Sequence, residues 1–201
     1  MILFPESGTV LYISNTNAFS TSGVSVHLTK DEVQNGLLHM EAILEKAEVG
    51  RMALSEGSIP YIVPLGFIYH KGKIAFHCSW EGKKLDIIAK NPNCCFEVDE
   101  FMGEVSYHYE SKCHLDYDSV LAFGKARIER DEAEKIRLLQ LFGEKYDERY
   151  KKSIPEGGLR IAVNKSIVEC ACVIIDVQEM TGRRERTVDG KREKTLWHHR
   201  F

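Results

Sequence analysis

In PYIVPLGFIYHKGKIAFHCS, residues 60–79, two runs rich in β-branched and aromatic residues flank a Lys-Gly pair. Runs of this composition favour β-strands, and a short polar pair that contains glycine favours a hairpin turn between them. Because RMALS, residues 51–55, precedes this stretch, three short strands in hairpin order are predicted. Pro60 and Pro64 have no N–H to donate, so they are expected at strand starts, edges or bulges.

The flanking sequence predicts further strands and three helices. Strands are expected over residues 94–101, 117–131 and 166–182, and helices over residues 28–50, 81–92 and 131–150. In the first helix Thr29 and Glu32 have capping-box spacing and Gly50 offers a stop, whereas Pro92 ends the second helix. Strands in hairpin order, with few helices and no βαβ alternation, predict the α+β class in the form of an antiparallel barrel.

The length and composition of the chain favour one main domain. With 201 residues, 43% of them hydrophobic, the chain can bury one sizeable core, which is expected over residues 29–182. Residues 1–28, rich in Ser, Thr and Asn, are expected to be a flexible extension, and residues 183–201 a basic C-terminal tail. The net charge of −3 argues against a nucleic-acid partner. No apolar run approaches the roughly 20 residues that span a bilayer, so no membrane association is expected.

Six cysteines occur in a chain whose N-terminus has no Lys or Arg before its brief apolar run. This N-terminus lacks the basic region of a signal peptide, so a cytoplasmic location with free thiols is expected. Cys170 and Cys172 share a strand face, as two metal ligands could, but no second Cys or His pair has convincing zinc spacing. Buried thiols that act as small hydrophobic groups, and no metal site, are therefore predicted.

The join between the third strand and the second helix has an unusual composition, FHCSWEGKK at residues 76–84. A helix N-terminus offers free N–H groups and a partial positive charge, and Gly82 allows an anion to approach the backbone. Lys83 and Lys84 add two full charges at the same end. This combination predicts a site for an anion such as a phosphate. Solvated surface lysines are the alternative interpretation.

Two further side chains are candidates for contact with a ligand. Regular alternation places His77 and Ser79 on one strand face and Cys78 on the other, so only one of these sets can line a pocket. A lone histidine at a strand end is usually a surface residue, but the neighbouring lysines make His77 a candidate. Near the C-terminus, Trp197 is a candidate to cover a flat ligand by stacking, the alternative being a solvated tail.

Two stretches resemble a known family. VGRMALSEGSIPYIVPLGFIYHKGKIAFHCSWEGKKLDIIAKNPNCCFEVD and then YDSVLAFGKARIERDEAEK are similar to the pyridoxamine 5′-phosphate oxidase-like flavoproteins with the FMN-binding split barrel. Within that family the Nim-type branch, associated with nitroimidazole reduction, is the most similar. The resemblance covers about residues 37–182. It implies an antiparallel split β-barrel with flanking helices, and a homodimer with FMN at the subunit interface.

The resemblance also implies a set of cofactor-binding residues. These are Arg51, Val63, Pro64, Leu65, His77, Cys78, Ser79, Lys83, Lys84, Ser119, Trp197 and Arg200. In this correspondence VPL runs beside the isoalloxazine ring, FHCS lies along the flavin and its ribityl phosphate, and GKK clamps the phosphate. Arg51 and Ser119 match positions near the cofactor. The tail, through Trp197 and Arg200, would reach the flavin and cover it.

The function implied is an FMN-dependent oxidoreductase that takes electrons from a reduced nicotinamide and passes them to a small planar or nitro-aromatic substrate. The flavin supplies the chemistry, which agrees with the absence of an acid–base dyad or nucleophile triad in the sequence. His77 is the candidate catalytic residue, as a hydrogen-bond or proton donor. One alternative is a non-catalytic flavin- or haem-binding protein on the same barrel, and another is a scaffold without cofactor. The chain reproduces the substrate motifs of the vitamin B6 oxidases poorly, which argues against pyridoxal phosphate synthesis.

Overall fold

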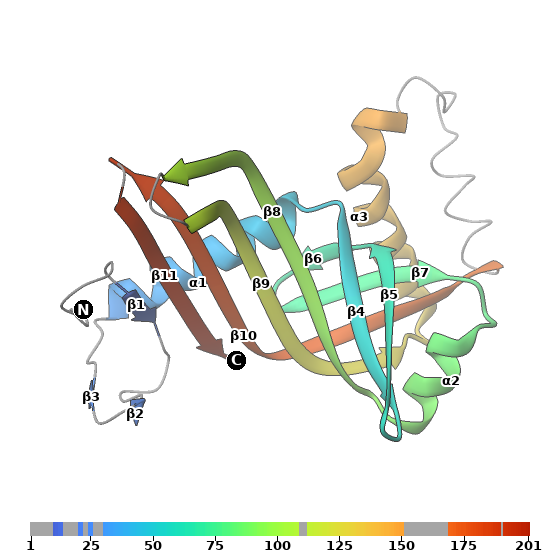
Figure 1. The fold of residues 1–201 in the computed structure, drawn as a ribbon. Coiled ribbons are helices and arrows are strands. Elements are labelled where there is room, and N and C mark those ends of the chain that lie inside the picture. Colours follow the sequence, from blue (N-terminus) through green and yellow to red (C-terminus); the bar gives the residue numbers. More distant parts are fainter. Residues whose placement is uncertain are drawn as a thin grey trace. The chain divides into compact units, whose positions relative to one another are not determined.

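The computed structural model describes residues 10–13, 20–21, 24–25, 30–108, 112–150, 169–189 and 191–201. Its strands are β1 (Val10–Ile13), β2 (Ser20–Thr21), β3 (Val24–Ser25), β4 (Val49–Glu56), β5 (Ile59–Gly66), β6 (Ile68–His70), β7 (Lys73–Cys78), β8 (Asn93–His108), β9 (Lys112–Ile128), β10 (Ala171–Val188) and β11 (Lys191–Arg200). Its helices are α1 (Lys30–Lys46), α2 (Lys83–Lys90) and α3 (Glu132–Tyr150) (Figure 1). None of these helices has the length and apolar character needed to cross a membrane.

Two units make up the chain, and strands β8, β9 and β10 contribute residues to both. The first unit contains Met1–Ala47, Phe96–Phe123 and Gln178–Phe201, and the second contains Glu48–Cys95 and Gly124–Val177. The pairs β4–β5, β6–β7, β7–β10 and β10–β11 are antiparallel. The α+β class with antiparallel strands, predicted from the sequence, is therefore confirmed.

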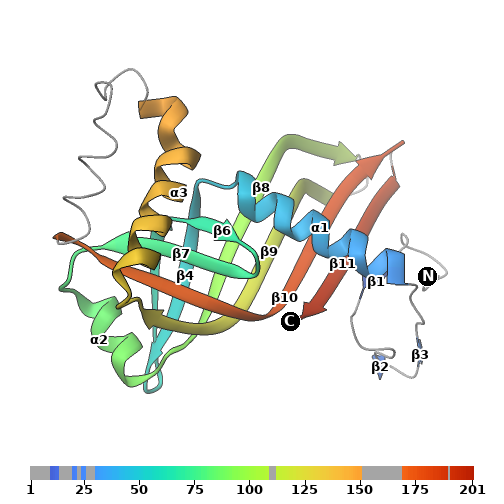
Figure 2. The same ribbon diagram turned by 180° about the vertical axis from the view of Figure 1, so that it is seen from behind.

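In the first unit, α1 lies across β10 and β11 (Figure 2). The strands follow the order β1-β11-β10-β9-β8, and β10 and β11 are in register from Glu179–Arg200 to Val188–Lys191. The apolar face of α1 packs here because its buried residues recur at helical spacing. The core between helix and strands includes Met40, Leu44, Val98, Val120, Met180 and Trp197.

One glycine permits the close approach of α1 to β10. A Cβ atom on Gly182 would lie 2.8 Å from Met40 Cγ and 2.8 Å from Trp197 Cε3. Ordinary carbon contacts need about 3.5 Å or more, so a larger side chain at this position would push the helix or the indole away. The glycine in the Thr181-Gly182 pair, where the predicted strand ends, is therefore needed for the close packing of α1. Strand β10 continues beyond this pair to Val188.

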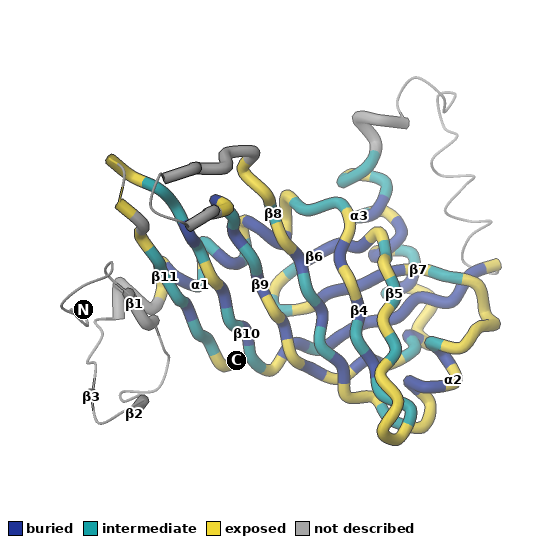
Figure 3. The backbone as a smooth tube through the Cα atoms, in the orientation of Figure 1, coloured by how far each residue is buried: buried dark blue, intermediate teal, exposed yellow. Residues whose placement is uncertain are grey.

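In the second unit, two hairpins lie beside α2 and α3. Gly57 (φ 63°) turns β4 into β5, and Lys71 (φ 50°) with Gly72 (φ 74°) turns β6 into β7. Figure 3 shows that the tube is buried along the middle of β7 and the part of β10 paired with it, whereas β5 is partly or fully exposed. The core of this unit includes Met52, Leu54, Phe67, Ile74, Phe76, Ile87, Val173 and Ile175.

Tyr146 of α3 explains why the run PYIVPLGFIYH forms two strands. Its hydroxyl accepts a hydrogen bond from the Phe67 N–H at 3.0 Å and donates one to the Glu48 carbonyl at 2.7 Å. The backbone of Phe67 is thereby turned toward the helix, and the strand breaks between Gly66 and Ile68. The helix thus takes a backbone donor that a continuous strand would have used in its ladder.

The prediction for the C-terminal end is wrong, whereas most of the N-terminal end is not described. Residues 183–200, expected as a tail, form the end of β10 and the whole of β11. Asp189-Gly190 is a common hairpin signal, which the density of charged residues around it obscured. Most of residues 1–28, together with Thr29, lies outside the described residues.

Candidate functional site

The candidate site begins where β7 ends and α2 starts. Gly82 adopts φ 138°, a conformation that side-chain-bearing residues rarely accept, and its carbonyl accepts the Leu85 N–H at 2.9 Å. No side chain caps the helix at this end. The Ser79 hydroxyl instead accepts the N–H of Glu81 at 3.4 Å. Gly82 therefore sets the direction of α2 and leaves its first turn without a side-chain cap.

The two lysines that open α2 point in different directions. Lys83 Nζ lies 3.4 Å from Glu56 Oε2 and 5.5 Å from the centre of the Tyr61 ring. Lys84 Nζ lies 3.9 Å from the position that a Cβ on Gly82 would take. Burial raises the pKa of the Cys78 thiol, and the charge of Lys84 opposes this rise. Lys83 thus reaches back to the β4–β5 hairpin, whereas Lys84 folds over the start of its own helix.

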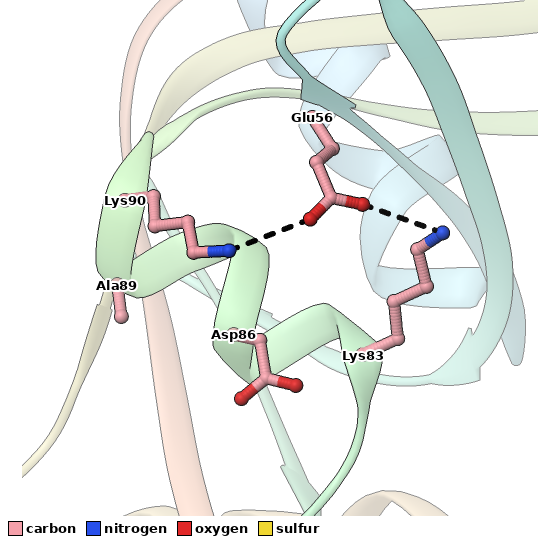
Figure 4. Close-up of a pocket in the computed structure, with 5 residues that line it drawn as sticks. All are labelled: Glu56, Lys83, Asp86, Ala89 and Lys90. Atoms are coloured by element: carbon pink, nitrogen blue, oxygen red, sulfur yellow. Dashed lines mark hydrogen bonds and ion pairs between the residues drawn. The ribbon is translucent and has the colours of Figure 1, made fainter.

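Glu56 joins α2 to the hairpin. Figure 4 shows its carboxylate between Lys83 and Lys90, whose Nζ lies 3.5 Å from Glu56 Oε1. The hydrogen bond and charge of Lys83, followed by those of Lys90, lower the pKa of Glu56, so the carboxylate is ionised at neutral pH. These three residues, with Asp86 and Ala89, line an open hollow of about 590 Å³. The mixed charge of this hollow makes it a poor site for a free anion.

His77 lies near the end of β7, where its ring contacts α3. Its ring meets Phe142 of α3 edge-on, with the ring centres 4.9 Å apart. The residue remains exposed, but desolvation by its packing lowers the pKa of the imidazole. His77 is therefore neutral near pH 7, and it can donate a hydrogen bond through one ring nitrogen and accept one through the other.

Three thiols gather near this strand end. Cys78 is opposite Ala171 in the β7–β10 register, and Ala171 lies between Cys170 and Cys172 in the sequence. Burial raises the pKa of all three thiols, that of Cys172 to about 12. They are thus neutral at pH 7. Within the part of the chain that the structure describes, no group of three or more His, Cys, Asp or Glu side chains could hold a metal ion.

Arg51 and the VPL segment lie on paired strands. Arg51 is opposite Pro64 in the β4–β5 register, and both are exposed on the outward face of the hairpin. Val63 and Leu65 are half-buried on the other face, opposite Met52 and Gly50. The prediction that Pro64 marks an edge is confirmed, because β5 is the last strand of its sheet order.

The other candidates, Ser119, Trp197 and Arg200, belong to the first unit. Ser119 is half-buried on β9, and the Arg200 Nε donates to Glu179 Oε2 at 3.2 Å. Trp197 is only 7% exposed, and its ring centre lies 4.3 Å from that of His39 under α1. This placement favours a core role for the indole over the stacking lid considered from the sequence.

Three features of this region have no local sequence signal. Glu56 pairs with lysines 27 and 34 positions further along the chain, and Lys135 of α3 lies over the Trp80 ring at 5.0 Å. Burial raises the pKa of the Cys78 thiol and the charge of Lys84 opposes this rise, although alternation gave no reason to connect the two residues. Long-range partners of this kind depend on the fold, so only the exposed aromatic in the Ser-Trp-Glu loop could have drawn attention beforehand.

A family model for pyridoxamine 5′-phosphate oxidase matches residues 39–184. No curated protein sequence matches the chain. The matched range contains the strand end, the lysine pair and the VPL segment. It ends before β11, so Trp197 and Arg200 lie outside it.

Several solved structures share the fold. A candidate 5-nitroimidazole antibiotic resistance protein from Bacteroides thetaiotaomicron is 22% identical with a TM-score of 0.56, over 72% of this chain and 81% of that one. A flavocytochrome from Azotobacter vinelandii is 18% identical with a TM-score of 0.59, over 81% and 73%. An FAD- and haem-binding protein from Mycobacterium smegmatis is 15% identical with a TM-score of 0.58, over 69% and 64%. The predicted fold, an antiparallel split β-barrel with flanking helices, is confirmed.

Proposed function

Since the chain belongs to the pyridoxamine 5′-phosphate oxidase family, we propose that it is an FMN-dependent oxidoreductase. The observation that supports this most directly is the loop between β7 and α2. It lies inside the matched range and presents a glycine at φ 138° with a lysine ammonium 3.9 Å from its missing Cβ. A phosphate monoester needs a cation and an accessible backbone, and this loop offers both.

The residues around the loop fit a flavin mononucleotide. The phosphate would lie at the start of α2, and the ribityl chain would pass the end of β7 at His77, Cys78 and Ser79. Because β5 is an edge strand, the backbone of its VPL segment has N–H and C=O groups available for the polar rim of the flavin ring. When bound, the flavin supplies hydride and electron transfer. The role of the protein is then to hold the ring, exclude water and place a neutral hydrogen-bond donor, His77, beside it.

The proposed reaction passes electrons from a reduced nicotinamide to a small planar or nitro-aromatic acceptor. The nitroimidazole-resistance relative from Bacteroides, a match in fold at 22% identity, supports the choice of acceptor class. No strongly shifted acid or base is needed, because an aromatic acceptor can take its proton from water or from a neutral donor such as His77.

A homodimer with the flavin at the subunit interface is part of this proposal. The outward face of the β4–β5 hairpin is apolar, with Val49 55% and Ile62 63% exposed, and Arg51 lies on the same face. An exposed apolar surface on a terminal strand is a common protein–protein contact. A second subunit covering this face would also enclose a ring placed against β5.

The proposal is tested by turnover. Purified protein saturated with FMN is mixed with NADH or NADPH under nitrogen, and a nitro-aromatic or quinone acceptor is then added. Bleaching of the flavin by the nicotinamide and its recovery with the acceptor would support an oxidoreductase. Flavin that stays bound and oxidised with both donors would favour the non-catalytic carrier, and a Soret band in the purified protein would favour the haem-binding alternative.

A further inference from the structure

The imidazole of His77 packs against one aromatic ring and remains accessible elsewhere. Its ring and that of Phe142 meet edge-on, with their planes at 73° and their centres 4.9 Å apart. Phe142 of α3 is only 8% exposed, whereas His77 at the end of β7 is exposed. The imidazole therefore has a buried apolar neighbour on one side and can still be reached by a ligand.

Phe142 is itself supported by the next turn of α3. Tyr146 lies four residues further along the helix, so the two rings share one helix face. Their centres are 6.0 Å apart and their planes differ by 14°, which is within the range of stacked aromatic pairs. The Tyr146 hydroxyl is held by the Glu48 carbonyl at 2.7 Å and the Phe67 N–H at 3.0 Å. The strand backbone thus fixes Tyr146, whose ring supports Phe142 and, through it, His77.

From this row of three rings, and resting on the role of His77 in the function proposed above, we infer that Phe142 is the positioning residue of His77. The ring contact restricts the orientation of the imidazole and keeps water from one of its sides. Phe142 acts through His77, and this role requires no contact between Phe142 and the flavin or the acceptor.

Packing rather than charge sets the protonation state of His77. Desolvation lowers the pKa of its imidazole, and in the part of the chain that the structure describes no charged side chain contributes to this shift. The residue opposite His77 in the β7–β10 register is Cys172, and burial raises the pKa of that thiol to about 12, so it is neutral. Removal of the Phe142 ring should let water return to the imidazole and raise the pKa of His77.

The inference is tested by the titration of His77, followed by NMR of its ring proton as the pH is varied. His77→Gln identifies the signal among those of the eight histidines. Phe142→Leu keeps an apolar side chain but removes the ring, so the pKa of His77 should rise. Phe76→Leu is the matched control, because it makes the same change at a buried position on the opposite face of β7. This control should lower the thermal stability and leave the titration unchanged.

A second arm asks whether the two residues act as one unit in turnover. With saturating FMN, a nicotinamide donor and a nitro-aromatic acceptor, His77→Gln should lower kcat by at least about tenfold. Phe142→Leu should lower kcat by about three- to tenfold, because a misplaced donor loses part of its contribution. The double variant should fall within about twofold of His77→Gln alone, since no imidazole is left to position. Phe76→Leu should leave kcat unchanged.

Two results would overturn the positioning role of Phe142. One is a pKa of His77 that is the same in Phe142→Leu and the wild type, and the other is a multiplicative loss of kcat in the double variant. An unchanged kcat in His77→Gln, or wild-type protein that does not turn over, would instead overturn the proposed function at His77. The titration does not depend on turnover, so the two failures are distinguishable.

Discussion

At the scale of single residues, burial decides what each ionisable side chain can do. Asp118 on β9 is 3% exposed and receives Arg184 Nε at 2.9 Å and Arg186 Nη2 at 2.9 Å. Glu56 is partly exposed and bridges two exposed lysines. At Asp118, fixed arginine partners replace the water that would hydrate the carboxylate, so removing the carboxylate lowers the stability of the protein. The ion pairs of Glu56 are screened by water and contribute little to stability.

Asp118→Asn should destabilise the protein by about 2–4 kcal/mol, because it leaves partly buried arginines without their counter-charge. Urea unfolding at pH 7 measures this loss. Glu134→Gln, which breaks an exposed pair with Arg137, is the control and should cost less than about 0.5 kcal/mol. Equal losses of stability in the two variants would contradict the stabilising role of the Asp118 ion pairs.

The same carboxylate should make stability depend on pH. Despite the opposing effect of burial, hydrogen bonds from His39 and Arg184 and the charges of the arginines lower the folded-state pKa of Asp118. A lowered pKa means that the contribution is fully present above the unfolded value of about 4 and is lost as pH falls toward the folded value. Wild type should therefore lose more stability than Asp118→Asn between about pH 5 and pH 2. Parallel curves of unfolding free energy against pH would exclude this role.

Gly182→Ala should destabilise the first unit by about 1–3 kcal/mol, since the new methyl group overlaps Met40 and Trp197 at 2.8 Å. The control is Gly66→Ala, where the nearest atom, the Tyr146 hydroxyl oxygen, is 3.5 Å from the added Cβ. It should cost less than about 1 kcal/mol. Thermal denaturation followed by tryptophan fluorescence compares the two, and a milder effect at position 182 would contradict the close approach of α1.

At the scale of elements, one helix residue fixes how α3 meets the strands. The hydroxyl of Tyr146 serves the backbone of both Glu48 and Phe67, so it joins the start of β4 to the break between β5 and β6. The Lys145 ammonium also lies over the Phe67 ring at 4.2 Å. The N–H of Phe67 thus has its acceptor on a helix side chain.

Tyr146→Phe should destabilise the protein by about 1–3 kcal/mol, because the buried Phe67 N–H loses its acceptor. Amide hydrogen exchange provides a second measurement, in which the Phe67 amide should exchange faster. The exchange of amides in α1 should be unchanged apart from the global loss of stability. An unaffected Phe67 amide would show that another group satisfies it.

Local sequence pattern predicted most elements and failed where a distant partner decides. The β6–β7 hairpin and α2, with Pro92 just beyond it, follow from turn and helix-stop chemistry close in sequence. The break at Phe67 depends on Tyr146, which is 79 residues away. In the site, the loop and its lysines were predicted from residue types, whereas the partner of Lys83, Glu56, required the fold. Trp197 was treated as a tail residue because the strand that buries it was not predicted.

At the scale of the whole molecule, the proposed function depends on assembly. The exposed apolar face of the β4–β5 hairpin is the surface we propose for a second subunit. Ile62→Glu places a charge at its most exposed large residue and should shift a dimer to a monomer in light scattering. It should also lower FMN affinity by at least about tenfold, as expected if the interface encloses the ring. A dimer that persists with unchanged FMN binding would place the interface elsewhere.

The most direct test of the central claim is the absorption spectrum of the purified protein, repeated on the supernatant after heat denaturation. The account predicts the two visible bands of an oxidised flavin, and FMN released at about one molecule per subunit. A protein that shows no flavin bands and takes up no added FMN would contradict it.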